Sequence, residues 1–514
     1  MAPETRPEQN QPRPLSDIVR AVGADTTERV ADTGRTVSGI THDSRQVRPG
    51  DLYAALPGEQ AHGADFSRQA VAAGATAILT DPAGRERAAA AGVPVLTVDS
   101  PRSHLGSAAA CVYGHPADSL LLIGTTGTSG KTTVTYLVES GLRASGMSTG
   151  LVGTVEMRVG DDRVQSSLTT PEATDLHGLL AVMRERGVAA AAMEVSSHAL
   201  ALGRVGETRY DVAVFTNLSQ DHLDFHTDLR EYFETKARLF TPEHCSTAVI
   251  NRDDQFGRAL VDMVEDRGAV EVTTFSTAGD AQADWRALDI RSGADGSTFH
   301  VVGPGGVQAD ASVCLPGPFN VSNALAAIVA LVDAGVPLQE AVRGVSESPG
   351  VPGRMERVDE GQDFTALVDY SHKPGAIEAV LGSLREVTRG RVIIVLGCGG
   401  DRDRAKRPLM GETASALADM VIVTNDNPRS EDPITIITGM LDGVTKVPPE
   451  RRAGVTVEPD RAAAISLAVD RAASDDVVVV AGKGHERGQY VGSEVVWFDD
   501  REVLREALRR RAGT

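Results

Sequence analysis

Short apolar runs recur along the chain, and each one ends in a glycine-rich or polar loop that is followed by a helical pattern of apolar positions. The runs, four to six residues long, are Leu120–Ile123, Val188–Met193, Val212–Phe215, Val392–Leu396, Met420–Val423 and Val477–Ala481. Apolar runs of this length that alternate with helices are typical of parallel strands buried on both faces. The pattern therefore predicts an α/β protein built on parallel sheets.

Polar residues cluster directly after these runs. The clusters read GTTGTSGKTT, EVSSH, TNLSQDHLD, GCGGDRDR, TNDNPRS and GKGHE. Parallel α/β sheets place their chemistry in the loops beyond the carboxyl ends of the strands. We therefore expect the functional residues to lie in these loops.

Composition narrows the class of protein and its partners. The 514 residues include 71 acidic and 51 basic side chains, a formal charge of -20, which argues against nucleic-acid and anionic-membrane partners. The four cysteines form no C-x-x-C pair, so we expect neither a disulfide framework nor a thiolate zinc site. The polar, proline-rich start resembles neither a signal peptide nor an anchor, and no apolar run approaches the ~20 residues of a membrane span. These features predict a cytoplasmic protein.

A phosphate-binding loop is the strongest local signal. It follows the run Leu120–Ile123 and precedes apolar positions with helical spacing, so backbone N–H groups and a helix start would face a phosphate. Lys131 is expected to contact the β- and γ-phosphates of ATP, and the Thr132 hydroxyl to ligate Mg²⁺. The match is incomplete, because Thr125 stands where the strict pattern has glycine. The expected ATP-binding residues here are Gly127, Thr128, Ser129, Gly130, Lys131, Thr132 and Thr133.

Several further motifs follow this loop in a fixed order. They are Met193-Glu194-Val195-Ser196-Ser197-His198, the stretch from Thr216 to Asp224, Lys236 within YFETKARLF, GPFN ending at Asn320, GRME starting at Gly353, and VDYSHKP containing Asp369. Together with Asp43-Ser44-Arg45 near the N-terminus, they resemble the Mur ligase family of peptidoglycan synthesis, most closely its MurE type. The resemblance runs from about Asp43 to Glu486.

The resemblance implies metal-binding and nucleotide-binding roles for residues that would not stand out in the sequence on their own. Glu194 would be a magnesium ligand, His222 would help to hold a second magnesium, and Lys236 would carry a carbamate that also faces metal. Together with Lys131, these three residues form the expected catalytic set. Without the surrounding motifs these residues would be an acidic loop residue, a structural histidine and a surface lysine. The family's remaining nucleotide contacts fall on Asn217, Asn320, Arg354 and the ribose-binding Asp369.

The resemblance also implies where the acyl-donor substrate, UDP-MurNAc-L-Ala-D-Glu, binds. Ser44 and the stretch Glu59, Gln60 and Ala61 would face the nucleotide sugar. Thr169, Thr170, Ser196 and Arg204 would contact the muramoyl peptide. An arginine suits an anionic partner because its guanidinium can pair bidentately with a carboxylate.

The DNPR motif indicates the amino acid that is added. In the family this motif accompanies diaminopimelate, whose distal carboxylate Arg429 could pair with, whereas lysine would present a like charge. An Asx–Pro turn without this role is the alternative for the motif alone. The expected diaminopimelate-binding residues are Arg402, Asp426, Asn427, Pro428, Arg429, Gly482 and Glu486.

The resemblance implies an ATP-dependent ligase that adds diaminopimelate to the D-Glu carboxylate through an acyl phosphate, acting as a monomer in cell-wall synthesis. A lysine-adding relative, a folylpolyglutamate synthetase and a phosphate-loop protein that binds ATP without ligation are the alternatives. We expect three domains, a UDP-sugar-binding α/β domain, a central P-loop ATPase-like parallel-sheet domain and a C-terminal Rossmann-like α/β domain, with ATP lying between domains. With a disordered lead-in, the predicted divisions are 1–14, 15–117, 118–348 and 349–514.

Overall fold

The computed structural model describes residues 5–26, 34–164, 168–293 and 295–513. These residues fold as two compact units. The first comprises 1–287, 301–309 and 323–345, and the second comprises 288–300, 310–322 and 346–514. The predicted boundary at 117/118 lies inside the first unit, between its two main sheets. Residues 288–300 and 310–322 belong with the second unit, although the sequence pattern placed them in the central domain.

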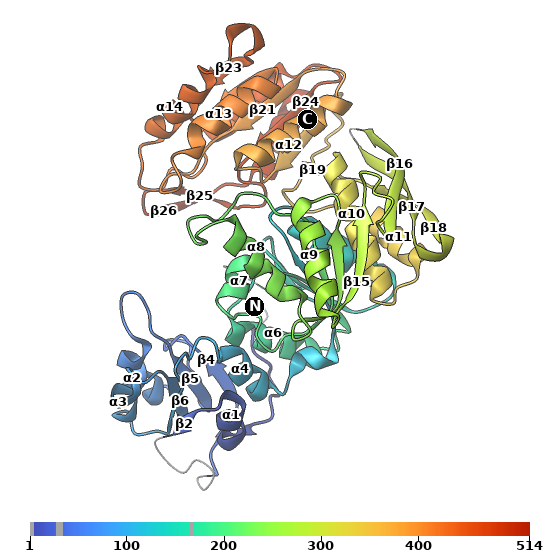
Figure 1. Ribbon diagram of the computed structural model, residues 1–514. Coiled ribbons are helices and arrows are strands. Elements are labelled where there is room, and N and C mark those ends of the chain that lie inside the picture. The colour runs from blue at the N-terminus through green and yellow to red at the C-terminus, as the bar shows by residue number, and fades with distance from the viewer. Residues whose placement is uncertain (1–4, 27–33, 165–167, 294, 514) are drawn as a thin grey trace. The chain divides into compact units, whose positions relative to one another are not determined.

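The first of these sheets has five strands in the order β2-β7-β6-β5-β4, parallel except at the β2–β7 edge. Helices α1 and α4 supply apolar side chains to its core. Figure 1 shows α1 and α4 beside this sheet, in the blue part of the chain. The bounds are β2 Asp25–Thr26, β4 Gly39–Thr41, β5 Asp51–Ala55, β6 Ala77–Thr80, β7 Val95–Thr97, α1 Leu15–Val22, α2 Ser67–Ala72, α3 Arg85–Ala89 and α4 Leu105–Tyr113.

The lead-in differs from its predicted disorder. Residues from Thr5 to Pro14 are described, and Arg13–Pro14 forms β1, which pairs with β3 at Thr36–Val37. The Arg6 guanidinium donates to the largely buried Asp51 carboxylate at 2.7 Å. The Glu185 carboxylate accepts two backbone N–H groups of this segment. Residues 5–14 therefore depart from the predicted disorder, because polar composition does not reveal such long-range partners, and residues 1–4 lie outside the described part of the chain.

A second sheet carries the phosphate loop, and its strands from β8 through β15 lie in the first unit. Its strand order is β11-β10-β9-β12-β8-β13-β14-β15-β16-β17-β18, with parallel pairing from β9 through β16. The strands are β8 Leu121–Thr126, β9 Thr149–Val152, β10 Met157–Val159, β11 Asp162–Val164, β12 Ala190–Glu194, β13 Tyr210–Phe215, β14 Cys245–Asn251, β15 Glu271–Ser276, β16 Trp285–Gly293, β17 Gly296–Val302 and β18 Gln308–Val313. The helices are α5 Lys131–Ala144, α6 Ala173–Glu185, α7 Ser197–Ala201, α8 Leu229–Ala237, α9 Gln255–Arg267, α10 Pro318–Asp333 and α11 Leu338–Ser346.

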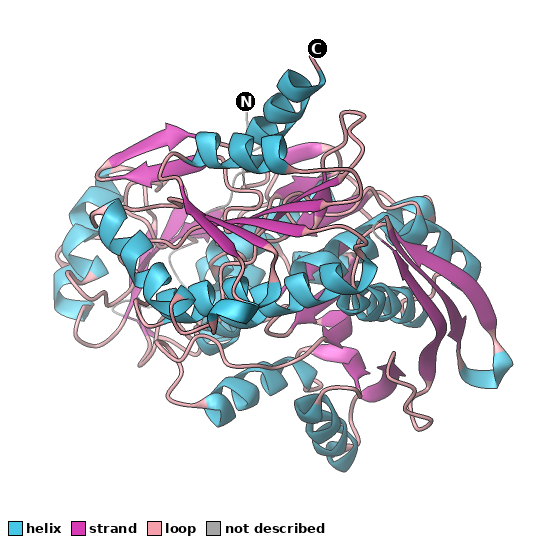
Figure 2. Cartoon of the chain, turned by 90° about the horizontal axis from the view of Figure 1, so that it is seen from above, coloured by secondary structure: helices cyan, strands magenta, loops and turns pink. Residues whose placement is uncertain are grey.

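The second unit contains a six-stranded sheet in the order β19-β20-β24-β21-β22-β23, parallel except for β19. Helices cover both of its faces (Figure 2), with α12, α13 and α14 side by side on one of them (Figure 1). The strands are β19 Glu356–Arg357, β20 Thr365–Asp369, β21 Val392–Leu396, β22 Met420–Val423, β23 Gly454–Val457 and β24 Val477–Ala481, and a hairpin follows, β25 Gly488–Val491 and β26 Glu494–Trp497. The helices are α12 Pro374–Val387, α13 Lys406–Leu417, α14 Pro433–Val444, α15 Arg461–Arg471 and α16 Asp500–Ala512.

These sheets confirm the predicted α/β fold class. Three of the six predicted strands, β21, β22 and β24, have the bounds that the apolar runs indicated. Their side chains alternate between two helix layers, so both faces are apolar and the run is continuous. No helix in the described part of the chain is long and apolar enough to cross a bilayer.

A buried histidine joins α6 to the loop that follows α7. The His177 side chain is fully buried, and its Nε2 lies 2.9 Å from the carbonyl oxygen of Gly206. Gly206 in turn packs against Gly106 of α4 so closely that a Cβ at Gly106 would lie 2.5 Å from the same oxygen. Burial lowers the pKa of His177 to about 4.

This histidine is expected to make the first unit acid-sensitive. Because the folded pKa lies below the unfolded value, stability present above pH 6.5 is lost as the pH falls toward 4. The loss attributable to His177 at pH 5 is about 2 kcal/mol. Denaturant unfolding at pH 7.5 and pH 5 should therefore show a smaller acid loss in His177→Gln than in the wild type. The surface substitution His104→Gln is the control, and equal acid losses in all three proteins would contradict the assignment.

Candidate functional site

The phosphate loop joins β8 to α5, as predicted from the sequence. The Lys131 ammonium donates to the carbonyl oxygens of Gly127 at 2.9 Å and Thr128 at 3.0 Å, so the side chain folds back over the loop. Gly130 has a φ of 87°, and a Cβ there would lie 2.4 Å from the Asn323 side-chain oxygen. Glycine is therefore required at position 130, both for its backbone conformation and for the close approach of Asn323.

The loop after β13 is fastened to the phosphate loop. The Asn217 side chain accepts the Ser129 backbone N–H at 3.0 Å and donates to the Ser129 carbonyl at 3.1 Å. The Thr216 hydroxyl donates to the same carbonyl at 2.7 Å. The Thr128 N–H donates to the Asn217 carbonyl at 2.9 Å. These hydrogen bonds join the two loops, and they place Asn217 against the phosphate loop.

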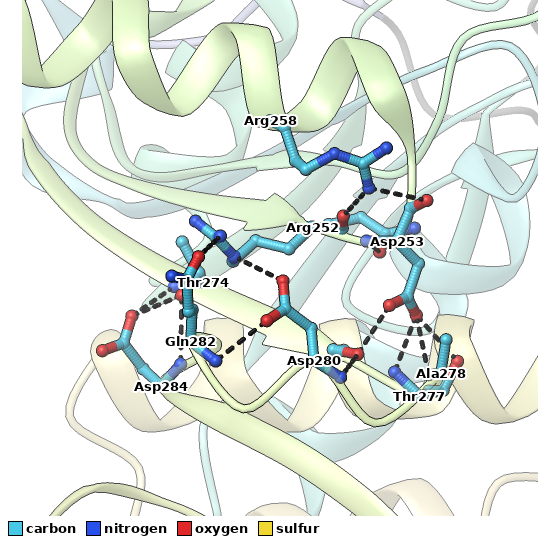
Figure 3. Close-up of polar contacts among 11 residues, drawn as sticks. Arg252, Asp253, Arg258, Thr274, Thr277, Ala278, Asp280, Gln282 and Asp284 are labelled. Carbon is cyan, nitrogen blue, oxygen red and sulfur yellow. Dashed lines mark hydrogen bonds and ion pairs between the residues drawn. The ribbon is translucent and has the colours of Figure 1, made fainter.

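Residues at the end of β14 and directly after it support the same two loops. The Asn251 side chain donates to the Thr216 carbonyl at 2.8 Å, and Asp254 accepts the Leu218 N–H at 3.3 Å. Between them, the Asp253 carboxylate accepts backbone N–H groups of the segment after β15, as Figure 3 shows at Thr277 and Ala278. Hydrogen bonds of these kinds fix loops that secondary structure leaves unpaired.

Glu194 ends β12 next to the phosphate loop. Its carboxylate is 1% exposed and accepts the Thr132 hydroxyl at 3.0 Å, the Thr154 N–H at 2.8 Å and the Thr154 hydroxyl at 3.2 Å. All three donors described for this carboxylate are neutral. A buried carboxylate beside a hydroxyl, with neutral partners, fits a small divalent cation with oxygen ligands such as Mg²⁺.

Lys236, on α8, lies under the phosphate loop and not at the surface. Its side chain is 1% exposed, its ammonium donates to the Gly127 carbonyl at 2.9 Å, and it sits 4.6 Å from the centre of the Tyr232 ring. His222 has a φ of 53°, and its Nε2 lies 3.2 Å from the Asp221 carboxylate. The centre of the His222 ring lies 6.2 Å from that of Tyr232, whose hydroxyl is 3.3 Å from the Thr128 hydroxyl of the phosphate loop, so both residues lie near this loop.

A cluster of three or more His, Cys, Asp or Glu side chains fit for a metal is absent from the described residues. The predicted magnesium ligands include two residues of other types, because Thr132 would offer a hydroxyl and Lys236 a carbamate. The roles of His222 and Lys236 in binding metal stay predictions.

The residues predicted for the muramoyl peptide gather around Glu194. The Thr170 hydroxyl donates to the Glu194 carbonyl at 2.9 Å and accepts the Ser196 N–H at 3.1 Å. The Thr169 and Thr154 hydroxyls lie 3.0 Å apart. Thr169, Thr170 and Ser196 therefore flank the same strand end as the carboxylate.

Arg204 lies at this place but already has an anionic partner. Its Nε donates to the Glu172 carboxylate at 2.9 Å, and Arg102 donates to the other Glu172 oxygen at 3.2 Å. The sequence analysis missed Glu172, because an acidic residue after Thr-Thr-Pro carries no signal of its own. A substrate anion would share the guanidinium with this carboxylate.

The predicted nucleotide-sugar residues fall on two loops of the first sheet. Ser44 lies beside Tyr53, whose hydroxyl donates to the Gly63 carbonyl at 2.9 Å. Glu59, Gln60 and Ala61 are exposed. The neighbouring His42 lies 3.0 Å from the Thr174 hydroxyl at the start of α6, which ties the Ser44 loop to the segment that carries Thr170.

Three predicted nucleotide contacts lie in the second unit. The Asn320 side chain donates to the Pro316 carbonyl at 2.8 Å, and Arg354 stacks 4.3 Å from the centre of the Tyr370 ring. The Asp369 carboxylate accepts the N–H groups of Met355 and Ser371, each at 2.8 Å. These bonds fix the side chains on which a ribose contact would depend.

The DNPR loop follows β22, and the GKGHE loop follows β24. The Asn427 amide donates to the Glu486 carboxylate at 2.9 Å, which joins the two loops. A Cβ at Gly482 would lie 2.5 Å from the Asp426 carboxylate, so position 482 requires glycine. The predicted members of this pocket therefore come from adjacent strand ends.

Arg429 and Arg402 approach each other at the loop after β21. The Arg429 guanidinium donates to the Gly400 carbonyl at 2.8 Å and lies 5.8 Å from the centre of the Tyr490 ring. A Cβ built at Gly399 would be 2.9 Å from the Arg429 guanidinium and 3.8 Å from the Arg402 side chain. Arg429 has a φ of 51°, unusual for a residue with a side chain, and its backbone pairs with Tyr490. The guanidinium of Arg429 therefore lies beside the loop after β21, which also carries Arg402.

A buried ion pair that the sequence did not reveal stands behind these loops. Arg461 and Asp500, both 0% exposed, pair at 2.6 Å, and Arg461 also donates to the carbonyls of Asn425 and Ala481. It therefore joins the ends of β22 and β24, where the DNPR and GKGHE loops begin. A charge that is buried in this way is stable only with such partners.

Comparison with known proteins gives matches across the chain. The Mur ligase family catalytic domain matches residues 36–113, the Mur ligase middle domain 125–331, and the Mur ligase glutamate ligase domain 353–484. Proteins named UDP-N-acetylmuramoyl-L-alanyl-D-glutamate–2,6-diaminopimelate ligase are 56% identical in Streptomyces avermitilis, covering 99% of each chain, and 46% identical in Corynebacterium glutamicum, covering 93% of each. A solved structure of a ligase with the same name is 33% identical, with a TM-score of 0.69 over 93% of this chain and 96% of that one.

Proposed function

The chain belongs to the Mur ligase family, and we propose that it uses ATP to join diaminopimelate to the D-Glu side-chain carboxylate of UDP-MurNAc-L-Ala-D-Glu. The reaction is an amide ligation of peptidoglycan precursor synthesis. We also assign the protein to the cytoplasm. Its four cysteines are free thiols, which is the state that a reducing compartment maintains.

The position of Glu194 is the observation that carries the proposal. Its side chain contacts Thr132 of the phosphate loop, and its backbone carbonyl contacts Thr170 of the predicted donor site. One residue would thus span the short distance between a nucleotide's terminal phosphate and a donor carboxylate. A nucleotide switch would need no such second site next to its phosphate loop.

The Thr132 hydroxyl and the Glu194 carboxylate fit Mg²⁺, because the carboxylate is buried and its described donors are all neutral, so a cation would balance its charge. When bound, Mg²⁺ supplies positive charge that offsets the charge of the phosphate oxygens. Lys236 and His222 are the further candidates near this position, Lys236 as its carbamate.

The chain's own residues would then align two reactants. Lys131 exchanges its contacts with the Gly127 and Thr128 carbonyls for phosphate oxygens, while the N–H groups of the rigid loop hold the phosphates. A donor carboxylate oxygen bonds to the γ-phosphorus as the bond to ADP breaks, which gives an acyl phosphate. The diaminopimelate amine then bonds to the acyl carbon, loses a proton and displaces inorganic phosphate. No side chain becomes a covalent nucleophile.

The pocket at the DNPR loop would choose the amino acid. Arg429 and Arg402 offer positive charge to the distal carboxylate of diaminopimelate, which lysine lacks. Glu486, held by Asn427, offers a carboxylate to an ammonium group. This arrangement of opposite charges matches the zwitterionic ends of diaminopimelate.

Phosphate release measured with one substrate omitted at a time tests the proposal. We expect release from ATP only when both the UDP-linked dipeptide and diaminopimelate are present, with lysine a poor replacement because it leaves Arg429 unpaired. The meso and LL isomers, assayed side by side, would define the stereochemistry. ATP turnover that is indifferent to both substrates would contradict a ligase.

A further inference from the structure

Lys483, in the GKGHE loop after β24, is a fully buried lysine with a complete set of acceptors. Its side chain is 0% exposed. The ammonium donates to the Asn427 side-chain oxygen at 3.0 Å and to the Gly488 carbonyl at 2.6 Å, and it lies 3.5 Å from the Glu486 carboxylate. An ammonium has three N–H donors, and here each one has an acceptor.

Two of these acceptors belong to the predicted amino-acid pocket. Asn427 comes from DNPR, and its amide orientation is fixed, because its oxygen accepts from Lys483 and from the Tyr490 N–H at 3.1 Å while its nitrogen donates to Glu486. Both described contacts of the Glu486 carboxylate fall on Oε2. No contact is described for Oε1, and 32% of the side chain is exposed.

The charge of Glu486 depends on its neighbours. Burial and the nearby Asp426 raise the pKa of this carboxyl, whereas Lys483 and the Asn427 amide lower it. Arg461 and Tyr370 are the other charged or titratable groups that face it. Lys483 is the cation that contacts Glu486 directly, so its loss would favour the protonated, neutral acid.

We propose that Lys483 is a positioning residue for the amino-acid substrate, which holds Asn427 in one orientation and keeps Glu486 an anion that can pair with a substrate ammonium. The inference rests on the proposed function, since it takes the DNPR and GKGHE loops as the diaminopimelate pocket. Lys483 itself is buried beneath Asn427 and Glu486 and acts through them.

The experiment compares Lys483→Met and Lys483→Gln with the wild type, and Lys446→Met, which removes a half-exposed lysine of the same unit, is the control. KM values for diaminopimelate and ATP are measured from pH 6.5 to 9, and the variant-to-wild-type ratio cancels the titration of the substrate. We expect a ratio of roughly 10 to 100 for diaminopimelate at pH 6.5. It should shrink toward pH 9 as Glu486 ionises, while the ATP ratio stays near 1.

A merely structural role gives a different result. The KM values for ATP and diaminopimelate would then rise together, or the diaminopimelate ratio would not change with pH, and either outcome overturns the proposal. Should both Lys483 variants fail to fold, Glu486→Gln decides. It must reproduce the loss at pH 6.5 and, having no ionisable group, must show no recovery at pH 9, whereas a KM equal to that of the wild type overturns the role of Glu486.

Failure of the proposed function is seen separately. The wild-type protein, assayed first, must release phosphate in a diaminopimelate-dependent manner. An inactive or diaminopimelate-indifferent wild type refutes the ligase assignment, whereas an active wild type with unaffected Lys483 variants refutes only the role of Lys483.

Discussion

Replacing Glu194 with glutamine is expected to lower the ligation rate by about a thousandfold while the protein stays folded. Glutamine has nearly the same shape: its oxygen can accept the Thr154 N–H, and its NH₂ group can donate to the Thr132 and Thr154 hydroxyls, which also accept hydrogen bonds, so the side chain keeps its buried partners. It lacks the negative charge that a divalent cation needs. Steady-state rates and thermal unfolding should be measured on the same preparations.

The control for this prediction is Glu234→Gln, which changes a half-exposed carboxylate on α8 that pairs with Arg230. It should leave the rate within about twofold, because surface pairs of this kind contribute little. If Glu194→Gln retained most of the wild-type rate at saturating Mg²⁺ and ATP, the carboxylate would have no part in the chemistry, and the site would have to be placed elsewhere.

Arg429→Ala is expected to raise the KM for diaminopimelate by roughly 30- to 1000-fold, the range for removal of one member of a buried charge pair. The guanidinium is held by the Gly400 carbonyl and lies near the Tyr490 ring, so it is already oriented before the substrate arrives. Preorganisation of this kind makes a charge pair specific as well as strong. The KM for ATP should change by less than about threefold, because the described partners of the Arg429 guanidinium, the Gly400 carbonyl and the Tyr490 ring, are not among the predicted nucleotide-binding residues.

Two comparisons sharpen this result. Arg404→Ala removes an exposed arginine of the neighbouring loop and should leave both KM values close to those of the wild type. Arg429→Ala should also narrow the preference for diaminopimelate over lysine, because the like charge that disfavours lysine is gone. Parallel rises in the KM values for ATP and diaminopimelate would show that Arg429 supports the fold and does not select the substrate.

The sequence predicted strand bounds best where a strand is apolar along its whole length. Strands β21, β22 and β24 are buried on both faces, so their apolar runs mark their ends. The apolar run at β12 ends at Met193, but the strand itself ends one residue later, at Glu194. The polar side chain of Glu194 had suggested a loop, although the residue is buried and belongs to the strand. The phosphate loop was predictable because glycine, lysine and threonine are each required at adjacent positions.

Long-range partners were not predictable from a single sequence. The Arg461–Asp500 pair joins residues 39 positions apart, and the ion pair of Arg6 with Asp51 orders a segment that looked disordered. Lys483 lay inside a motif that was noticed, yet its acceptors in the DNPR loop and the hairpin become visible only in three dimensions. Arg204 shows the reverse case, because an arginine that suits an anionic substrate also suits Glu172.

Transfer of one oxygen atom tests the acyl-phosphate mechanism most directly. The UDP-linked dipeptide is prepared with ¹⁸O in both oxygens of its D-Glu side-chain carboxylate and is converted with ATP and diaminopimelate. If this carboxylate attacks the γ-phosphorus, each inorganic phosphate released must carry one ¹⁸O, and the new amide must keep the other. Amide product accompanied by unlabelled phosphate would contradict the account.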